Sequence, residues 1–143
     1  MAITTIQNQV TWASALFVTV SSATEVTSDL FTLDQTTIGA GIALSVDNAG
    51  TPSSGDTAIF RLQWTMGDIL GDTGNDYDTS EHAPFLQMLD TYGTSTPGED
   101  PARTTVPIEI PMGAIGFKVA VTCANAATRN MVIRARVGEQ RAA

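Results

Sequence analysis

Cysteine and histidine, the residues of a thiol nucleophile and its base, each occur once in this chain. Cys123 is the only cysteine and His82 the only histidine, so they form the one Cys–His pair that the chain could use. Cys123 lies within an alternating apolar pattern, where a thiolate would be poorly stabilised. We therefore expect a buried, unreactive thiol, and with a single cysteine no intrachain disulfide can form.

A second chemistry is metal binding by the acidic segment that follows Gly67. Ca²⁺ takes several oxygen ligands from a flexible loop, and Asp72, Asp76 and Asp78 are the residues that would supply them. Gly74 stands at the third position of this run, so the segment does not match an EF-hand loop. A solvated acidic turn, in which Asp side chains cap local amides, is the alternative. We expect no other cofactor.

The remaining arrangements are a carboxylate pair and an exposed aromatic ring. No strand pattern presents two carboxylates into a cleft, so a glycosidase-like pair is not expected and we predict that the protein is not an enzyme. Trp64 alternates with Phe60 and Leu62, which predicts a place in the core. Tyr77 is the aromatic residue in a clearly polar segment, and it is the best candidate for a contact with a sugar or with another protein.

β-Strands must position these side chains, because short alternating apolar runs separated by turn residues fill most of the chain. The clearest run is 57–66, and two more, 116–123 and 131–138, close the chain. The last two runs predict an antiparallel hairpin with one dry face and one wet face. Its wet face would carry three basic residues, Lys118, Arg134 and Arg136.

These runs predict a single all-β domain spanning residues 1–143, built as an antiparallel β-sandwich, with the jelly roll as one arrangement that fits. Residues 1–11 depart from clean strand patterning and are expected to form an N-terminal arm. The region 67–105 is expected to be a long loop insertion. Within it, apolar residues at three- and four-residue spacing predict a short helix over 82–92.

Charge is unevenly distributed along the chain. The net charge is −8, yet residues 101–143 carry all but one of the 7 basic side chains, the exception being Arg61. Oppositely charged regions on one small body favour packing between identical copies, so we expect a homo-oligomer. The overall sign disfavours nucleic acid as a partner. No apolar stretch reaches the ~18 residues of a membrane span, and the N-terminus lacks the pattern of a signal peptide.

Two segments resemble a known class of proteins. The closing segment, from Ala114-Ile115-Gly116-Phe117 to Arg134-Ala135-Arg136-Val137, is similar to the end of small β-sandwich virion proteins of tailed bacteriophages. Phe60 to Asp68 resembles the preceding strand and its turn in those proteins. The resemblance covers about a third of the chain and contains no catalytic motif. It implies a capsid decoration or cement protein, or a head-fibre or tail accessory protein, which is assembled into the virion in the host cytoplasm.

The prediction is therefore a non-enzymatic virion protein that binds the major capsid protein or other virion subunits. The alternative is a carbohydrate-binding sandwich, with or without Ca²⁺, used for host attachment. We expect the protein contacts to be made by the N-terminal arm 1–11, by the loop 67–105 and by the basic wet face. The residues chosen from them are Ile3, Ile6, Gln7, Tyr77, Lys118, Arg134 and Arg136.

Overall fold

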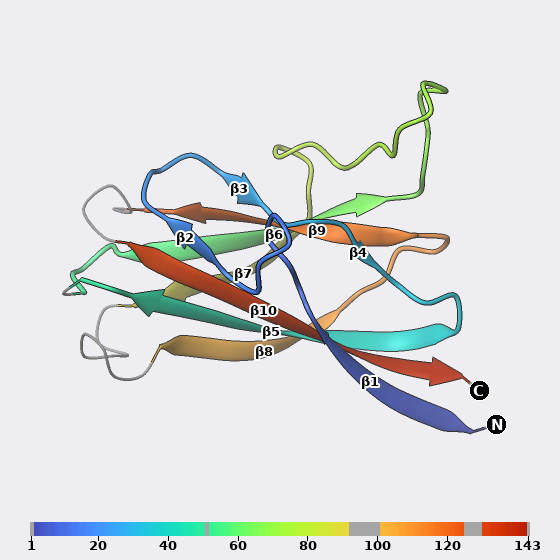
Figure 1. Ribbon diagram of the computed structural model, residues 1–143, viewed down its shortest axis with the longest axis horizontal. Coiled ribbons are helices and arrows are strands. Elements are labelled where there is room, and N and C mark those ends of the chain that lie inside the picture. The colour runs from blue at the N-terminus through green and yellow to red at the C-terminus, as the bar shows by residue number, and fades with distance from the viewer. Residues whose placement is uncertain (1, 51, 92–100, 125–129, 143) are drawn as a thin grey trace.

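The structure, a computed structural model, describes residues 2–50, 52–91, 101–124 and 130–142. Two antiparallel five-stranded sheets pack face to face (Figure 1). The first sheet contains β1 (Ile3–Gln9), β2 (Val18–Val20), β5 (Thr37–Asn48), β8 (Ala102–Ile108) and β10 (Met131–Ala142). The second sheet contains β3 (Val26–Thr27), β4 (Phe31–Thr32), β6 (Thr57–Thr65), β7 (Phe85–Asp90) and β9 (Gly116–Cys123). None of the described residues forms a helix that is long and apolar enough to cross a membrane.

The strand order is that of a jelly roll. The first sheet runs β1-β10-β5-β8, with β2 beside the start of β10, and the second runs β3-β9-β6-β7, with β4 beside the start of β9. Counting β1 with β2, and β3 with β4, as two interrupted strands leaves two four-stranded sheets between which the chain passes back and forth. The prediction of an all-β antiparallel sandwich is confirmed.

The last two strands do not form the predicted hairpin. β9 pairs with β6 and β3 in the second sheet, whereas β10 pairs with β5 and β1 in the first. The alternating pattern correctly identifies the dry face of each strand, because Phe117, Val119, Ile133 and Ala135 are all buried. Those two dry faces meet across the core instead of lying side by side, so the hairpin prediction is wrong.

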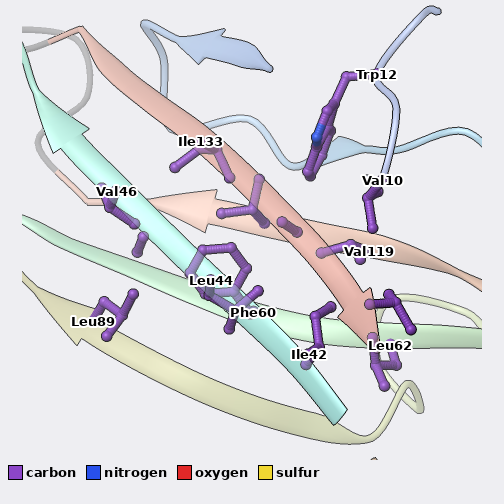
Figure 2. Close-up of a cluster of buried hydrophobic side chains, with 14 of the residues drawn as sticks. Val10, Trp12, Ile42, Leu44, Val46, Phe60, Leu62, Leu89, Val119 and Ile133 are labelled. Carbon is purple, nitrogen blue, oxygen red and sulfur yellow. The ribbon is translucent and has the colours of Figure 1, made fainter. Parts of the chain in front are cut away.

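The core lies between the two sheets and collects inward-facing side chains from both (Figure 2). The ring of Phe117 stacks on that of Phe31, with the ring centres 5.5 Å apart. It forms a T-shaped contact with the ring of Trp64, with the centres 5.1 Å apart. Each fully buried large apolar side chain contributes about 1.5–3 kcal/mol to the free energy of unfolding. Trp64 and Cys123 are buried, as predicted from their places in the pattern.

The region 67–105 contains strands where a helix was predicted. Phe85–Asp90 forms β7, which pairs with β6 from Thr57↔Asp90 to Arg61↔Phe85. The helix prediction over 82–92 is therefore wrong, and Tyr92 lies outside the described residues. The apolar residues of this short run fit either the helical or the strand periodicity. Pairing with the edge of β6 selects the strand. The end of the region, from Ala102, belongs to β8.

Residues 3–9 of the expected N-terminal arm form β1. This strand pairs with the second half of β10, from Gln9↔Arg136 to Ile3↔Ala142. The two strands form an extension at one end of the first sheet, with the start of β5 beside β10, and both chain ends lie there (Figure 1). Glu139 of β10 is buried at the base of this extension, where it accepts hydrogen bonds from Thr37, Asp34 and Arg141.

Candidate functional site

The outer face of the first sheet carries three exposed arginines, which we term the arginine face: Arg103, Arg134 and Arg136. Arg134 and Arg136 alternate with the buried residues of β10, so their side chains point away from the core. Arg103 occupies the corresponding position on β8, because Arg134 and Arg103 both pair with Ser45 of β5 between them. The strand register therefore brings Arg103 beside Arg134 and Arg136, from which it is far apart in the sequence.

A hollow of about 250 Å³ lies between these arginines, floored by the small side chains of Ala43 and Ser45. Arg136 donates a 3.4 Å hydrogen bond to Gln9. Among the described residues, the three guanidinium groups form no ion pair with a carboxylate. A guanidinium presents a planar fork of donors that fits carboxylate or phosphate oxygens two at a time. The arginine face is therefore suited to binding anionic groups.

An aromatic ring extends the arginine face toward β2. The guanidinium carbon of Arg134 lies 5.3 Å from the centre of the Phe17 ring. Phe17 and its neighbour Leu16 are 46% and 56% exposed, respectively. The surface thus combines positive charge with apolar side chains, a composition enriched at the centres of protein interfaces.

A tight turn presents Phe17 and Leu16. Ala13 and Ser14 have φ angles of 48° and 69°, a left-handed conformation that is uncommon for residues other than glycine. Asp29 holds the turn, since its carboxylate accepts hydrogen bonds from the amide of Ser14 at 2.9 Å, from the Thr11 hydroxyl at 2.7 Å and from the amide of Ala13 at 3.2 Å. The bond from the Ser14 amide, followed by that from Thr11, lowers the pKa of Asp29 below its ordinary value.

Lys118 does not belong to the arginine face. It lies on β9 opposite Gln63, on the outer side of the second sheet, so the core separates it from Arg134 and Arg136. Its ammonium group lies 4.3 Å from the centre of the Tyr77 ring. Lys118 and Tyr77, both predicted as contact residues, are thus brought together, but away from the predicted arginines.

The acidic loop, defined as residues 67–78, contains a cluster of three carboxylates. Oxygen atoms of Asp68, Asp72 and Asp76 all lie within 4.8 Å of one another. Two of the three residues predicted to bind Ca²⁺ are therefore adjacent, and Asp68 joins them. Asp78 is not in this cluster, because its amide donates to the Trp64 carbonyl at 2.9 Å and holds it against β6.

The clustered carboxylates hold the loop together through its own amides. Asp68 accepts hydrogen bonds from the amides of Thr73, Asp72 and Gly71, which lower its pKa, the Thr73 bond most strongly. Asp76 accepts from the amides of Ile69 and Leu70 at 2.7 and 2.9 Å. This is the self-capped acidic turn that was the alternative to a calcium site, and calcium binding itself stays a prediction.

The predicted N-terminal contact residues are accessible on β1. Ile3 and Gln7 are exposed and share the outer face of the sheet with Gln9 and Arg136, whereas Ile6 is half-buried on the other side. The extension of β1 and β10 therefore continues the surface that carries the arginine face.

Cys123 and His82 are not arranged as a catalytic pair. Cys123 is completely buried, and burial raises the pKa of its thiol to about 11. His82 is exposed in the turn before β7, where its Nδ1 lies 3.0 Å from the Thr79 hydroxyl.

The site residues chosen from the sequence did not include Arg103, Phe17 or Asp68, although Asp68 lies in the acidic segment that was considered for Ca²⁺. Arg103 could have been found, because the alternation of 102–108 places it on the face opposite Ala102 and Ile108, both buried. Its position beside Arg134 depends on the pairing of β8 with β5, which no local pattern encodes.

No protein-family profile and no curated protein sequence match the chain. Among solved structures, it is similar to a chain of the acid-stable capsid of Helicobacter pylori bacteriophage KHP30, with 13% identity and a TM-score of 0.42 over 97% of this chain and 93% of that one. It is also similar to the cleaved adhesin domain of Lys-gingipain from Porphyromonas gingivalis, with 10% identity and a TM-score of 0.35 over 99% and 90% of the two chains. Both likenesses are weak.

Proposed function

We propose that this chain is a non-enzymatic structural protein of a tailed-phage virion, which binds an acidic surface of the capsid protein or another virion subunit as a decoration or cement protein. The observation that carries the proposal is the arginine face, with Arg103, Arg134 and Arg136 gathered over one hollow and no carboxylate paired with them in the described part of the chain. The resemblance of the closing segment to virion proteins supplies the context.

The fold is compatible with this role without selecting it. Jelly rolls occur in viral capsid proteins and also in lectins and cupins, so the function is inferred from the arginine face and not from the fold. The arginine face lies on the outer surface of the first sheet and has exposed Phe17 and Leu16 beside it. A protein surface with carboxylates around an apolar centre matches this surface in both charge and polarity.

Electrostatics favour a protein partner over a nucleic acid. The chain has a net charge of −8, so a nucleic acid would be repelled by most of the molecule even while three arginines attracted it. An acidic patch on a protein presents fewer charges at longer spacing. It can engage the arginine face while the acidic remainder of the chain points away.

A copy bound across two shell subunits stabilises the particle because it binds the assembled state and not the separated subunits. The stabilisation grows with the logarithm of the free concentration relative to the dissociation constant. Contacts that depend on exposed charges are screened by salt, with a Debye length of about 8 Å near physiological ionic strength. Binding through the arginine face should therefore weaken as salt is raised.

The test is the binding of purified protein to particles that lack it, measured by co-sedimentation. Replacing Arg134 by Glu should weaken binding by roughly tenfold or more, since a charge-assisted pair becomes a like-charge contact. Lys118→Glu is the matched control, because it changes net charge by the same amount on the opposite sheet. Equal binding of the two variants and the wild type would exclude docking through the arginine face.

A further inference from the structure

The acidic loop carries uncompensated negative charge. Its four aspartates are accompanied by no basic residue between Gly67 and Asp78. None of them forms an ion pair with a cation in the described ranges of the chain. Since Asp68, Asp72 and Asp76 lie within 4.8 Å of one another, their mutual repulsion would be relieved by a cation placed against them.

The same loop presents its largest apolar side chains to solvent. Ile69 and Leu70 are 74% and 75% exposed. The loop leaves the end of β6 and stands out from the body of the sandwich before it returns to the same strand (Figure 1). It is thus a protruding element that combines carboxylates with exposed apolar side chains.

The arginine face has the complementary composition, with guanidinium groups around a hollow and the apolar side chains of Leu16 and Phe17 beside it. Within one copy the two surfaces cannot meet. The arginine face lies on the outside of the first sheet, whereas the acidic loop returns to β6 of the second sheet and contacts Lys118 on that sheet's outer side.

We infer that the acidic loop of one copy docks on the arginine face of the next, so that the protein associates head to tail with itself. This inference rests on the proposed function, because it identifies the acidic virion surface as a neighbouring copy of this chain. Arginines of one copy lie against Asp68, Asp72 and Asp76 of the next, and Ile69 and Leu70 lie near Phe17. Two different patches meet in such a contact, so repetition produces a ring if the rotation closes and a row of copies if it does not.

The test uses two variants of the full chain, one with the charge of the arginine face reversed and one with the charge of the acidic loop neutralised. The face variant carries Arg103→Glu, Arg134→Glu and Arg136→Glu. The loop variant carries Asp72→Lys and Asp78→Lys, and it keeps Asp68 and Asp76 because their carboxylates hold the loop's amides. Circular dichroism and thermal melting confirm that each variant is folded. Sedimentation velocity over a hundredfold range of concentration then measures self-association.

The wild type should grow in average mass with concentration at about 50 mM NaCl and dissociate at about 500 mM NaCl, where screening is much stronger. Each variant alone should stay monomeric. In the face variant an acidic face meets an acidic loop, and in the loop variant the arginine face meets a loop that no longer has a net negative charge. An equimolar mixture should associate again, because the unchanged acidic loop of the face variant then meets the unchanged arginine face of the loop variant. This restoration on mixing cannot come from a folding defect in either variant.

A monomeric wild type at every concentration would overturn the inference, as would a mixture that stays monomeric or variants that still associate alone. Added calcium tests the alternative role of the loop, which is to bind a metal ion. If millimolar Ca²⁺ raises the melting temperature of the wild type but not of the loop variant, the carboxylates form a metal site and the inference fails. These measurements use no particles. If self-association is absent, the proposed binding to virions is still tested separately by co-sedimentation.

Discussion

The ammonium group of Lys118 lies 4.3 Å from the centre of the Tyr77 ring. Tyr77 forms an isolated bridge with Thr65 at the end of β6, while Lys118 projects from the neighbouring strand β9. The contact therefore fastens the returning end of the acidic loop to the outer face of the second sheet. It also covers one face of the only aromatic ring in that loop.

The first prediction concerns the strength of this contact. A cation held over an aromatic ring at a partly exposed site contributes about 0.5–1 kcal/mol. A double-mutant cycle with Lys118→Met and Tyr77→Leu, followed by urea unfolding, should give a coupling free energy in that range. Tyr77→Phe keeps the ring and should preserve the coupling. A coupling near zero would show that the two side chains are neighbours without a measurable attraction.

The second prediction separates the proposed role from carbohydrate binding. A sugar that stacks on Tyr77 has to displace Lys118 or use the other face of the ring. We therefore expect the isolated protein to bind no glycan on an array, with or without Ca²⁺. Specific glycan binding that is lost in Tyr77→Ala and kept in Arg134→Glu would favour the host-attachment function instead.

The third prediction concerns the close approach of β4 to β9. A methyl group added at Gly116 would lie 2.1 Å from the backbone carbonyl oxygen of Phe31, which cannot move without shifting the strand. Gly116→Ala should lower the free energy of unfolding by about 1–3 kcal/mol or more. Gly39→Ala is the control, since the added carbon there meets only the end of Gln140 at 3.8 Å. Equal stability of the two variants would contradict the packing described.

The fourth prediction concerns acid. The hydrogen bonds that Asp29 accepts from Ser14 and Thr11 lower its pKa below the ordinary 3.8. A carboxyl group whose pKa is lower in the folded state stabilises that state above pH 3.8, and the contribution fades as the pH falls through the folded value. The melting temperature of the wild type should exceed that of Asp29→Asn at neutral pH, and the difference should narrow toward about pH 2.5. A difference that is constant with pH would contradict this role of Asp29.

In the two closing strands, local patterns were sufficient to predict which large apolar side chains are buried. In β9 and β10 the period of two follows from backbone geometry alone, so Phe117 and Ile133 could be assigned to the core from the sequence. The same period does not specify the pairing partner. β9 and β10 therefore looked like a hairpin although they belong to different sheets, and Lys118 was grouped with Arg134 when the core lies between them.

The arginine face could not be predicted from local patterns, because it depends on the register between strands that are far apart in the sequence. Arg103 and Arg134 are neighbours only because β8 and β10 both pair with β5 at Ser45. The carboxylate cluster contains Asp68 where Asp78 was predicted, and the cause is similar. The amide of Asp78 donates to the Trp64 carbonyl, which holds Asp78 against β6. Turn chemistry suggested the acidic loop, but long-range pairing decided which of its carboxylates meet.

The most direct measurement for the central claim is the location and copy number of this chain in purified phage particles, by quantitative mass spectrometry and electron cryomicroscopy. The proposed decoration role predicts many copies per particle, arranged with the symmetry of the shell and with the arginine face against an acidic surface. A handful of copies at one vertex would indicate a fibre or tail protein. Absence of the chain from intact particles would contradict the proposal.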